Sequence, residues 1–162
     1  MIQPTPSGSW VIVVSFVVAF LLAIFPLPAH LMWARPDWVA LVLIYWVIAL
    51  PQRFGILLSF SVGLLLDILE GAMLGQHALS LSVVAYLGLV LYQRLRLFSM
   101  WQQAAVVFVM VGINQLVGLW LQNIAGLGMR GALFLMPAIM SALLWPGVMS
   151  SLRFLRRHFR VV

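Results

Sequence analysis

The sequence lacks cysteine and lysine altogether, and only three of its 162 residues are acidic. Without cysteine, disulfide bonds, thiol catalysis and thiolate metal sites are excluded. Charged residues make up 7% of the chain, whereas a soluble domain usually carries about 25%. So few charges cannot cover a surface that faces water. The composition therefore argues strongly against a soluble enzyme.

Long apolar runs take the place of the missing charges, and hydrophobic residues make up 65% of the chain. Charges and turn residues divide the sequence into six candidate spans, at residues 10–25, 37–50, 54–69, 78–92, 103–121 and 132–152. Crossing the hydrocarbon takes about 20 residues, so a short run such as 37–50 is either a half-helix or borrows length from its flanks. We predict one all-α domain over residues 1–162, a polytopic membrane helix bundle. About six transmembrane helices are expected, and five full spans with one short hairpin are the alternative.

The arginines favour six spans. With six spans, one side of the membrane carries seven arginines: Arg53, Arg94, Arg96, Arg153, Arg156, Arg157 and Arg160. The other side carries only Arg35, Arg130 and the three acids. Because cytoplasmic segments are enriched in basic residues, both termini are predicted to be cytoplasmic. The arginines form no patch interleaved with polar residues, so nucleic-acid binding is not expected.

An arginine-rich tail covers residues 153–162. Arg153, Arg156, Arg157 and Arg160 are interpreted as membrane-orienting residues that lie along anionic lipid headgroups. The alternative is a docking site for a cytoplasmic partner.

The third span carries a stripe of small and polar residues at every fourth position: Gly55, Ser59, Gly63, Asp67, Gly71 and Gly75. Residues four apart share one face of a helix, and small side chains allow a second helix to approach closely. Ser59, Gly63, Asp67 and Gly71 are therefore a candidate face for a partner helix or a pocket, and the stripe should end near Gly71 with the helix.

Asp67 is expected to face the protein interior, because a carboxylate in contact with hydrocarbon is costly. Three roles stay open for it: a structural anchor that caps or bonds a neighbouring helix, a wall of a ligand or partner site, and a carrier of protons or ions. Glu70 lies three residues later, and Arg35 and Arg130 are the candidate counter-ions.

A second stripe, on the fifth span, consists of Asn114, Gly118 and Gln122. Amide side chains in a membrane bond across helices, so these residues hold helices together or contact a ligand. No catalytic constellation is visible: His30, His77 and His158 are scattered, and none is spaced with a carboxylate for metal binding. The chain is predicted to be no enzyme and to bind no cofactor or metal.

The ordered motifs resemble those of a known family. Arg35-Pro36-Asp37-Trp38, Tyr45-Trp46 and Leu50-Pro51 precede the spacing Gly63, Asp67, Gly71 and Gly75, and they are followed by Trp101-Gln102-Gln103 and by Leu144-Trp145-Pro146 before the basic tail. Together they resemble the rod shape-determining membrane protein family MreD of Gram-negative bacteria, over nearly the whole chain. Glu70 departs from the family pattern, which has a small polar residue before Gly71.

The resemblance implies a non-enzymatic scaffold of the cell-wall elongation complex in the bacterial inner membrane, which maintains rod shape. Its implied partners are the membrane helix of MreC, then MreB, the wall polymerase and the transpeptidase, together with membrane lipid. It also implies a fold similar to the substrate-binding components of vitamin transporters, with a central pocket between the Asp67 and Asn114 stripes. A small transporter, or its substrate-binding subunit, is the alternative function.

Overall fold

A computed structural model describes residues 8–128 and 131–161. These residues form six α-helices and two short 3-10 helices: α1 (Ser9–Ile24), η1 (Ala29–Ala34), α2 (Trp38–Ala49), α3 (Ile56–Glu70), α4 (Gln76–Leu95), α5 (Met100–Ile124), η2 (Ala132–Leu135) and α6 (Met136–His158). Each α-helix coincides with one predicted span, and the all-α class is confirmed.

Among the described residues, four segments are long and apolar enough to cross a membrane: Ala29–Ala49, Gln76–Leu95, Met100–Ile124 and Leu133–His158. The first of them joins η1 to α2, so the short second span borrows length from its N-terminal flank. The α1 helix is apolar but shorter, with 16 residues, and α3 has 15. The prediction of a membrane helix bundle is confirmed.

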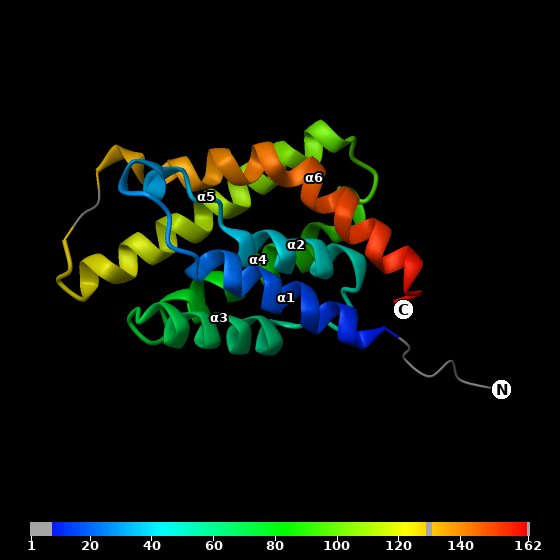
Figure 1. The fold of residues 1–162 in the computed structure, drawn as a ribbon, viewed down its shortest axis with the longest axis horizontal. Coiled ribbons are helices and arrows are strands. Elements are labelled where there is room, and N and C mark those ends of the chain that lie inside the picture. Colours follow the sequence, from blue (N-terminus) through cyan, green and yellow to red (C-terminus); the bar gives the residue numbers. More distant parts are fainter. Residues whose placement is uncertain (1–7, 129–130, 162) are drawn as a thin grey trace.

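The six helices run back and forth along the long axis of the molecule (Figure 1). Residues near the two chain ends therefore meet at one end of the bundle, where the rings of Trp10 and Phe159 lie with their centroids 4.7 Å apart. Gly8 also lies against Val161 there. Six helices that alternate in direction agree with the arrangement that the distribution of arginines favoured, and crossing of the membrane by all six stays a prediction.

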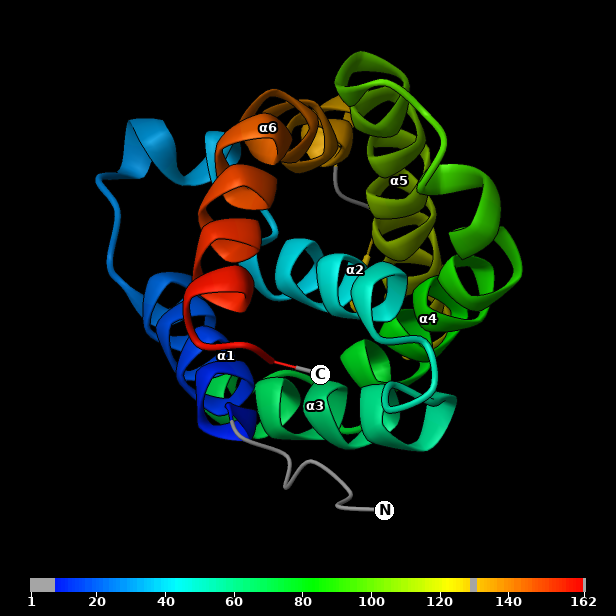
Figure 2. The same cartoon turned by 90° about the vertical axis from the view of Figure 1, so that its right-hand side faces the viewer.

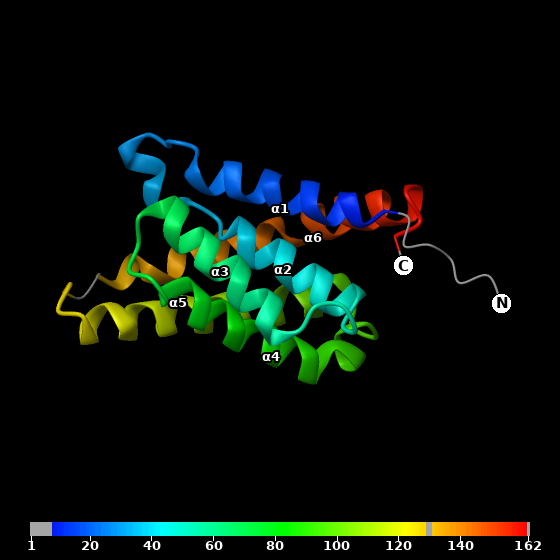
Figure 3. The ribbon, with the colours of Figure 1, turned by 90° about the horizontal axis from the view of Figure 1, so that it is seen from below.

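The α2 helix lies at the centre, surrounded by the other five α-helices (Figure 2). Every residue from Val39 to Ile48 is buried. A helix that is apolar on all sides has no face to offer to water, so enclosure by other helices follows from its sequence. Among the helices around α2, α3 and α4 pack most extensively on each other, and they lie side by side in Figure 3.

Because successive helices run in opposite directions, the charged residues form two groups at opposite ends of the bundle. Asp37, at the start of α2, lies with Asp67, Glu70 and Arg35 at what we call the acid-bearing end. The opposite, arginine-rich end carries Arg53, Arg94, Arg96, Arg153, Arg156, Arg157 and Arg160. The α6 helix continues to His158, so most of the predicted tail is helical.

Candidate functional site at the acid-bearing end

The small-residue stripe of α3 packs against α4 of the same chain. Ser59, Gly63 and Asp67 are all buried. A Cβ atom added at Gly63 would lie 2.5 Å from both the Cα of Ala78 and the carbonyl oxygen of His77, so only glycine permits this backbone approach. The close-packing role predicted for the stripe is present, but α4 of the same chain packs on the Ser59 and Gly63 part of the face that was assigned to a partner helix or a pocket.

Two glycines turn the chain from α3 into α4. Gly71 ends α3 with φ +66°, and Gly75 precedes α4 with φ +98°. Both lie in the left-handed region, which glycine enters without steric cost. As predicted, the helix ends immediately before Gly71. The turn brings the first residues of α4 back beside the last turn of α3.

Asp67 caps the N-terminus of α4 from the neighbouring helix. Gly75, the residue at the cap position, has no side chain that could accept a hydrogen bond. The Asp67 carboxylate instead accepts from the backbone N–H groups of Gly75 at 2.9 Å, His77 at 2.9 Å and Ala78 at 3.4 Å. These are donors that a helix start leaves without a partner inside the helix, and negative charge is favourable beside them. Of the three roles left open by the sequence, the structure shows the structural anchor.

His77 completes the charge pattern around Asp67. Its Nδ1 lies 2.8 Å from Oδ1 of Asp67, and its Nε2 lies 3.7 Å from Oε2 of Glu70. The side chain in contact with the Asp67 carboxylate is thus His77 and not Arg35, which was expected in that place. Arg35 instead donates from Nη2 to the carbonyl oxygen of Phe25. Arg130, the other predicted counter-ion, lies outside the described residues.

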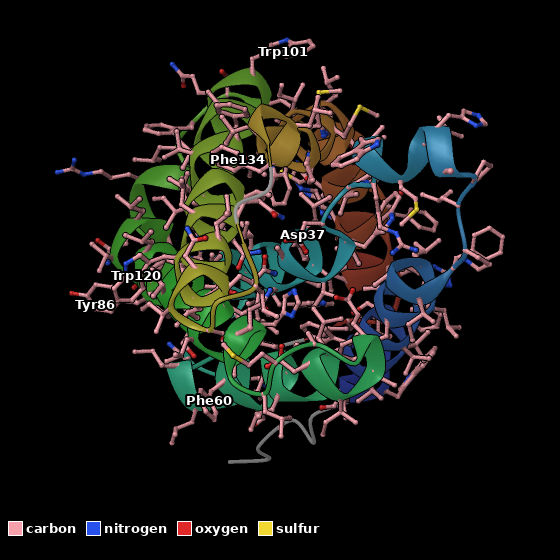
Figure 4. All side chains as sticks on the ribbon, turned by 90° about the vertical axis from the view of Figure 1, so that its left-hand side faces the viewer. Asp37, Phe60, Tyr86, Trp101, Trp120 and Phe134 are labelled. Carbon is pink, nitrogen blue, oxygen red and sulfur yellow. The ribbon has the colours of Figure 1, made fainter. Side chains whose placement is uncertain are left out.

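Asp37 joins three helices at the centre of the same end (Figure 4). Its Oδ1 accepts from the N–H of Ala40 at 3.3 Å, as an N-terminal cap of α2. Its Oδ2 accepts from Nδ2 of Asn114 on α5 at 2.5 Å, and its own N–H donates to Oγ of Ser141 on α6 at 2.9 Å. Asn114 therefore acts as a link between helices, one of the two roles that the sequence left open.

Two adjoining cavities, with volumes of about 420 and 550 Å³, open beside these groups. We call them together the polar chamber, because both are bordered by Glu70, His77 and Gln115. Asp37 and Arg35 border the larger part. The smaller part is bordered by residues of both predicted stripes, namely Gly71, Asn114, Gly118 and Gln122. Ser59 and Gly63 belong to the helix contact and do not border it.

Two buried polar atoms at the chamber lack a hydrogen-bond partner among the described residues: Oδ1 of Asn114 and Nε of Arg35. The amide nitrogen of Asn114 donates to Oδ2 of Asp37, so its oxygen faces elsewhere. Leaving a buried polar group unpaired costs about 1–3 kcal/mol. The chamber can thus hold a water or ligand that donates to Asn114.

Sequence reasoning missed His77 and Asp37 as members of this site. A polar residue just before an apolar run is the usual helix-cap signal, which could have identified Asp37. His77 can be recognised as a neighbour of Asp67 only from the structure, because the turn at Gly71 and Gly75 brings the start of α4 back beside Asp67. Within residues 8–128 and 131–161, no three His, Cys, Asp or Glu side chains gather as metal ligands.

Comparison with known proteins identifies the family. The family model of the rod shape-determining protein MreD matches residues 6–155. The rod shape-determining protein MreD of Haemophilus influenzae is 37% identical over 157 residues, which cover 94% of each chain. No solved structure matches the chain significantly, so the likeness to vitamin-transporter components stays a prediction. The chain belongs to the family of the rod shape-determining protein MreD.

Proposed function

We propose that the chain is a non-enzymatic scaffold of the cell-wall elongation complex, and that it holds the membrane helix of an MreC-type partner. Membership of the MreD family gives it a role in rod shape determination. Binding of MreC, MreB, the wall polymerase and the transpeptidase is the finer part of the proposal. Residence in the bacterial inner membrane, with both termini in the cytoplasm, is also a finer part of the proposal.

The observation that carries the proposal is how the polar groups of the acid-bearing end are used. Asp67 holds α4 to α3, and Asp37 holds α2 to α5 and α6. Charged groups inside a membrane protein are expensive, and here they are engaged in bonds between helices. This arrangement suits a rigid body whose outer helix faces serve as binding surfaces.

We propose the outer face of α1 as the surface for the partner helix. The α1 helix packs on α2 and contacts α3 and α6 only sparsely, which leaves room on both of its flanks. Val13, Val17 and Leu21 are exposed along it. Its small residues Ser15 and Ala19 are turned inward and buried. A single apolar span that lies along α1 would extend the ring around α2.

Photo-crosslinking in cells, with co-purification, tests this proposal. A photoreactive residue replaces Val13 or Val17 on α1, and the exposed positions Val109 and Leu116 on α5 serve as matched controls. We expect an MreC-type protein to co-purify in a defined ratio and to crosslink from α1. Crosslinks from α5 alone would refute the α1 face. Failure to recover any wall-elongation protein would refute the scaffold.

A second candidate function is a substrate-binding subunit of a small transporter, and the polar chamber is the observation that favours it. Its unpaired Asn114 oxygen would be satisfied by a ligand that donates a hydrogen bond. The chain purified without partners should then carry a small molecule in native mass spectrometry. Asn114→Ala should release that molecule, and the chain should co-purify with an ATPase-driven transport module.

A further inference from the structure

The arginine-rich end contains a cavity of its own, with a volume of about 590 Å³. Residues of α2, the end of α4, α5 and α6 surround it. Its inner wall includes the buried side chains of Tyr45, Gln103 and Trp145. The volume falls within the range of about 300–1,000 Å³ that is usual for small-molecule sites.

The inner wall is fixed by hydrogen bonds. Oε1 of Gln103 accepts from Nε1 of Trp145 at 3.3 Å, and its Nε2 donates to the carbonyl oxygen of Leu95 at 2.7 Å. Both ends of a buried amide are thus satisfied, so this wall does not need a ligand in order to be stable. A wall fixed in advance lowers the ordering cost of binding.

Arg96, at the edge of the cavity, has a structural role. Its Nε donates to the carbonyl oxygen of Ile48 at 3.0 Å, and its Nη2 donates to that of Ala49 at 3.1 Å. These carbonyls belong to the last turn of α2, where a helix leaves acceptors without an internal partner. Arg96 therefore caps the C-terminus of the buried central helix α2, and we do not assign it to a ligand.

Three further arginines, Arg153, Arg156 and Arg157, border the cavity from α6. Their spacing of three and four residues places them on adjoining parts of one helix face. In the described part of the chain no carboxylate pairs with them, because all three acidic side chains lie at the opposite end. Like charges so close together repel one another, and an anion in the cavity would relieve that repulsion.

We infer that this cavity binds an organic phosphate, a phosphomonoester or a diphosphate, whose oxygens accept from Arg153, Arg156 and Arg157. Guanidinium groups form paired, charge-assisted hydrogen bonds with phosphate oxygens. The Tyr45 phenol borders the same cavity and can donate a further hydrogen bond. Beyond them Trp145 and Met149 form an apolar wall for the carbon part of the ligand. A lipid headgroup and a soluble organic phosphate share this chemistry.

Binding to full-length protein in phosphatidylcholine nanodiscs tests the inference. The lipid probe is phosphatidic acid, a monoester, compared with phosphatidylglycerol, a diester, by native mass spectrometry. The soluble probe is inorganic pyrophosphate, measured by calorimetry. The double variant Arg153→Gln/Arg156→Gln removes two arginines of the cavity, and Arg94→Gln/Arg160→Gln removes the same charge outside it.

We expect one of the probes to bind about tenfold more weakly to the Arg153→Gln/Arg156→Gln variant than to the unchanged protein. The affinity of the same probe for the Arg94→Gln/Arg160→Gln control should change by less than about twofold. Loss of phosphatidic acid identifies a lipid site, and loss of pyrophosphate identifies a soluble ligand. Equal binding of both lipids by all variants would overturn the inference, because it indicates general attraction to anionic headgroups. Absence of binding would overturn it too. If the double variant does not fold, Tyr45→Phe should weaken the same probe about threefold.

Discussion

At the scale of single residues, the most consequential group is the Asp67 carboxylate. A buried charge is destabilising unless it is paired and hydrogen-bonded. Here it receives backbone donors from Gly75, His77 and Ala78 and a contact from the His77 ring. These hydrogen bonds offset the cost of burying the charge. They also cap the first turn of α4, which has no cap from its own N-terminal residue. Asp67 thus supplies the side-chain cap at the start of α4.

Substituting Asp67 by asparagine should lower the free energy of unfolding by about 2 kcal/mol, because an amide has one acceptor atom where the carboxylate has two. Unfolding of the detergent-purified protein, followed by circular dichroism, measures this change. Ser61→Ala is the matched control: Ser61 lies on the exposed face of the same helix and bonds only within it. If Asp67→Asn were as stable as Ser61→Ala, the cap would not depend on the charge.

Asn114 supports a prediction of the opposite kind, in which a charge is added. Asn114→Asp would place a second carboxylate against Asp37, at the site of a 2.5 Å hydrogen bond. Two acceptors would then face each other, and the loss of stability should reach about 2 kcal/mol. Asn123→Asp, on the exposed end of the same helix, should have little effect. Equal thermal stabilities of the two variants would show that the Asp37 link is not formed.

At the scale of helices, the two stripes predicted from sequence differ in how tightly they pack. Gly63→Ala places a Cβ against the backbone of α4, so α3 must move and stability should fall by about 1–3 kcal/mol. Gly118 is also a buried helical glycine, but its added Cβ would meet only Nε2 of Gln76 at 3.6 Å. Gly118→Ala should therefore be neutral or stabilising, by up to about 1 kcal/mol. Calorimetric unfolding of both variants separates the cases, and a stable Gly63→Ala would contradict the close approach.

The six helices could be predicted from the sequence because hydropathy and turn residues are local signals, and charges mark the ends of the spans. The partners of the polar residues could not be predicted, because they depend on contacts distant in sequence. Asp37 and Asn114 are 77 residues apart, and nothing in either segment encodes the pairing. Similarly, a stripe of small residues predicts a close neighbour but does not say that α4 of the same chain is that neighbour.

At the scale of the whole molecule, the acids and seven of the arginines lie at opposite ends of one bundle. Moving a cluster of arginines across a membrane is unfavourable, and basic loops stay on the cytoplasmic side during insertion. The arginine-rich end should therefore face the cytoplasm. Six helices that alternate in direction, with both described chain ends at that side, make this orientation consistent for every loop at once.

Because the chain contains no cysteine, single cysteines report its orientation without background. Gln52→Cys and Leu97→Cys lie at exposed positions of the arginine-rich end, and Ala125→Cys lies at an exposed position of the acid-bearing end. In bacterial cells with a permeable outer membrane, an impermeant maleimide should label Ala125→Cys at once. The other two should react only after the inner membrane is disrupted. If Gln52→Cys reacted first, the bundle would be inserted the other way round. Reaction of Gln52→Cys and Ala125→Cys from the same side would mean that α3 to α5 do not cross in series.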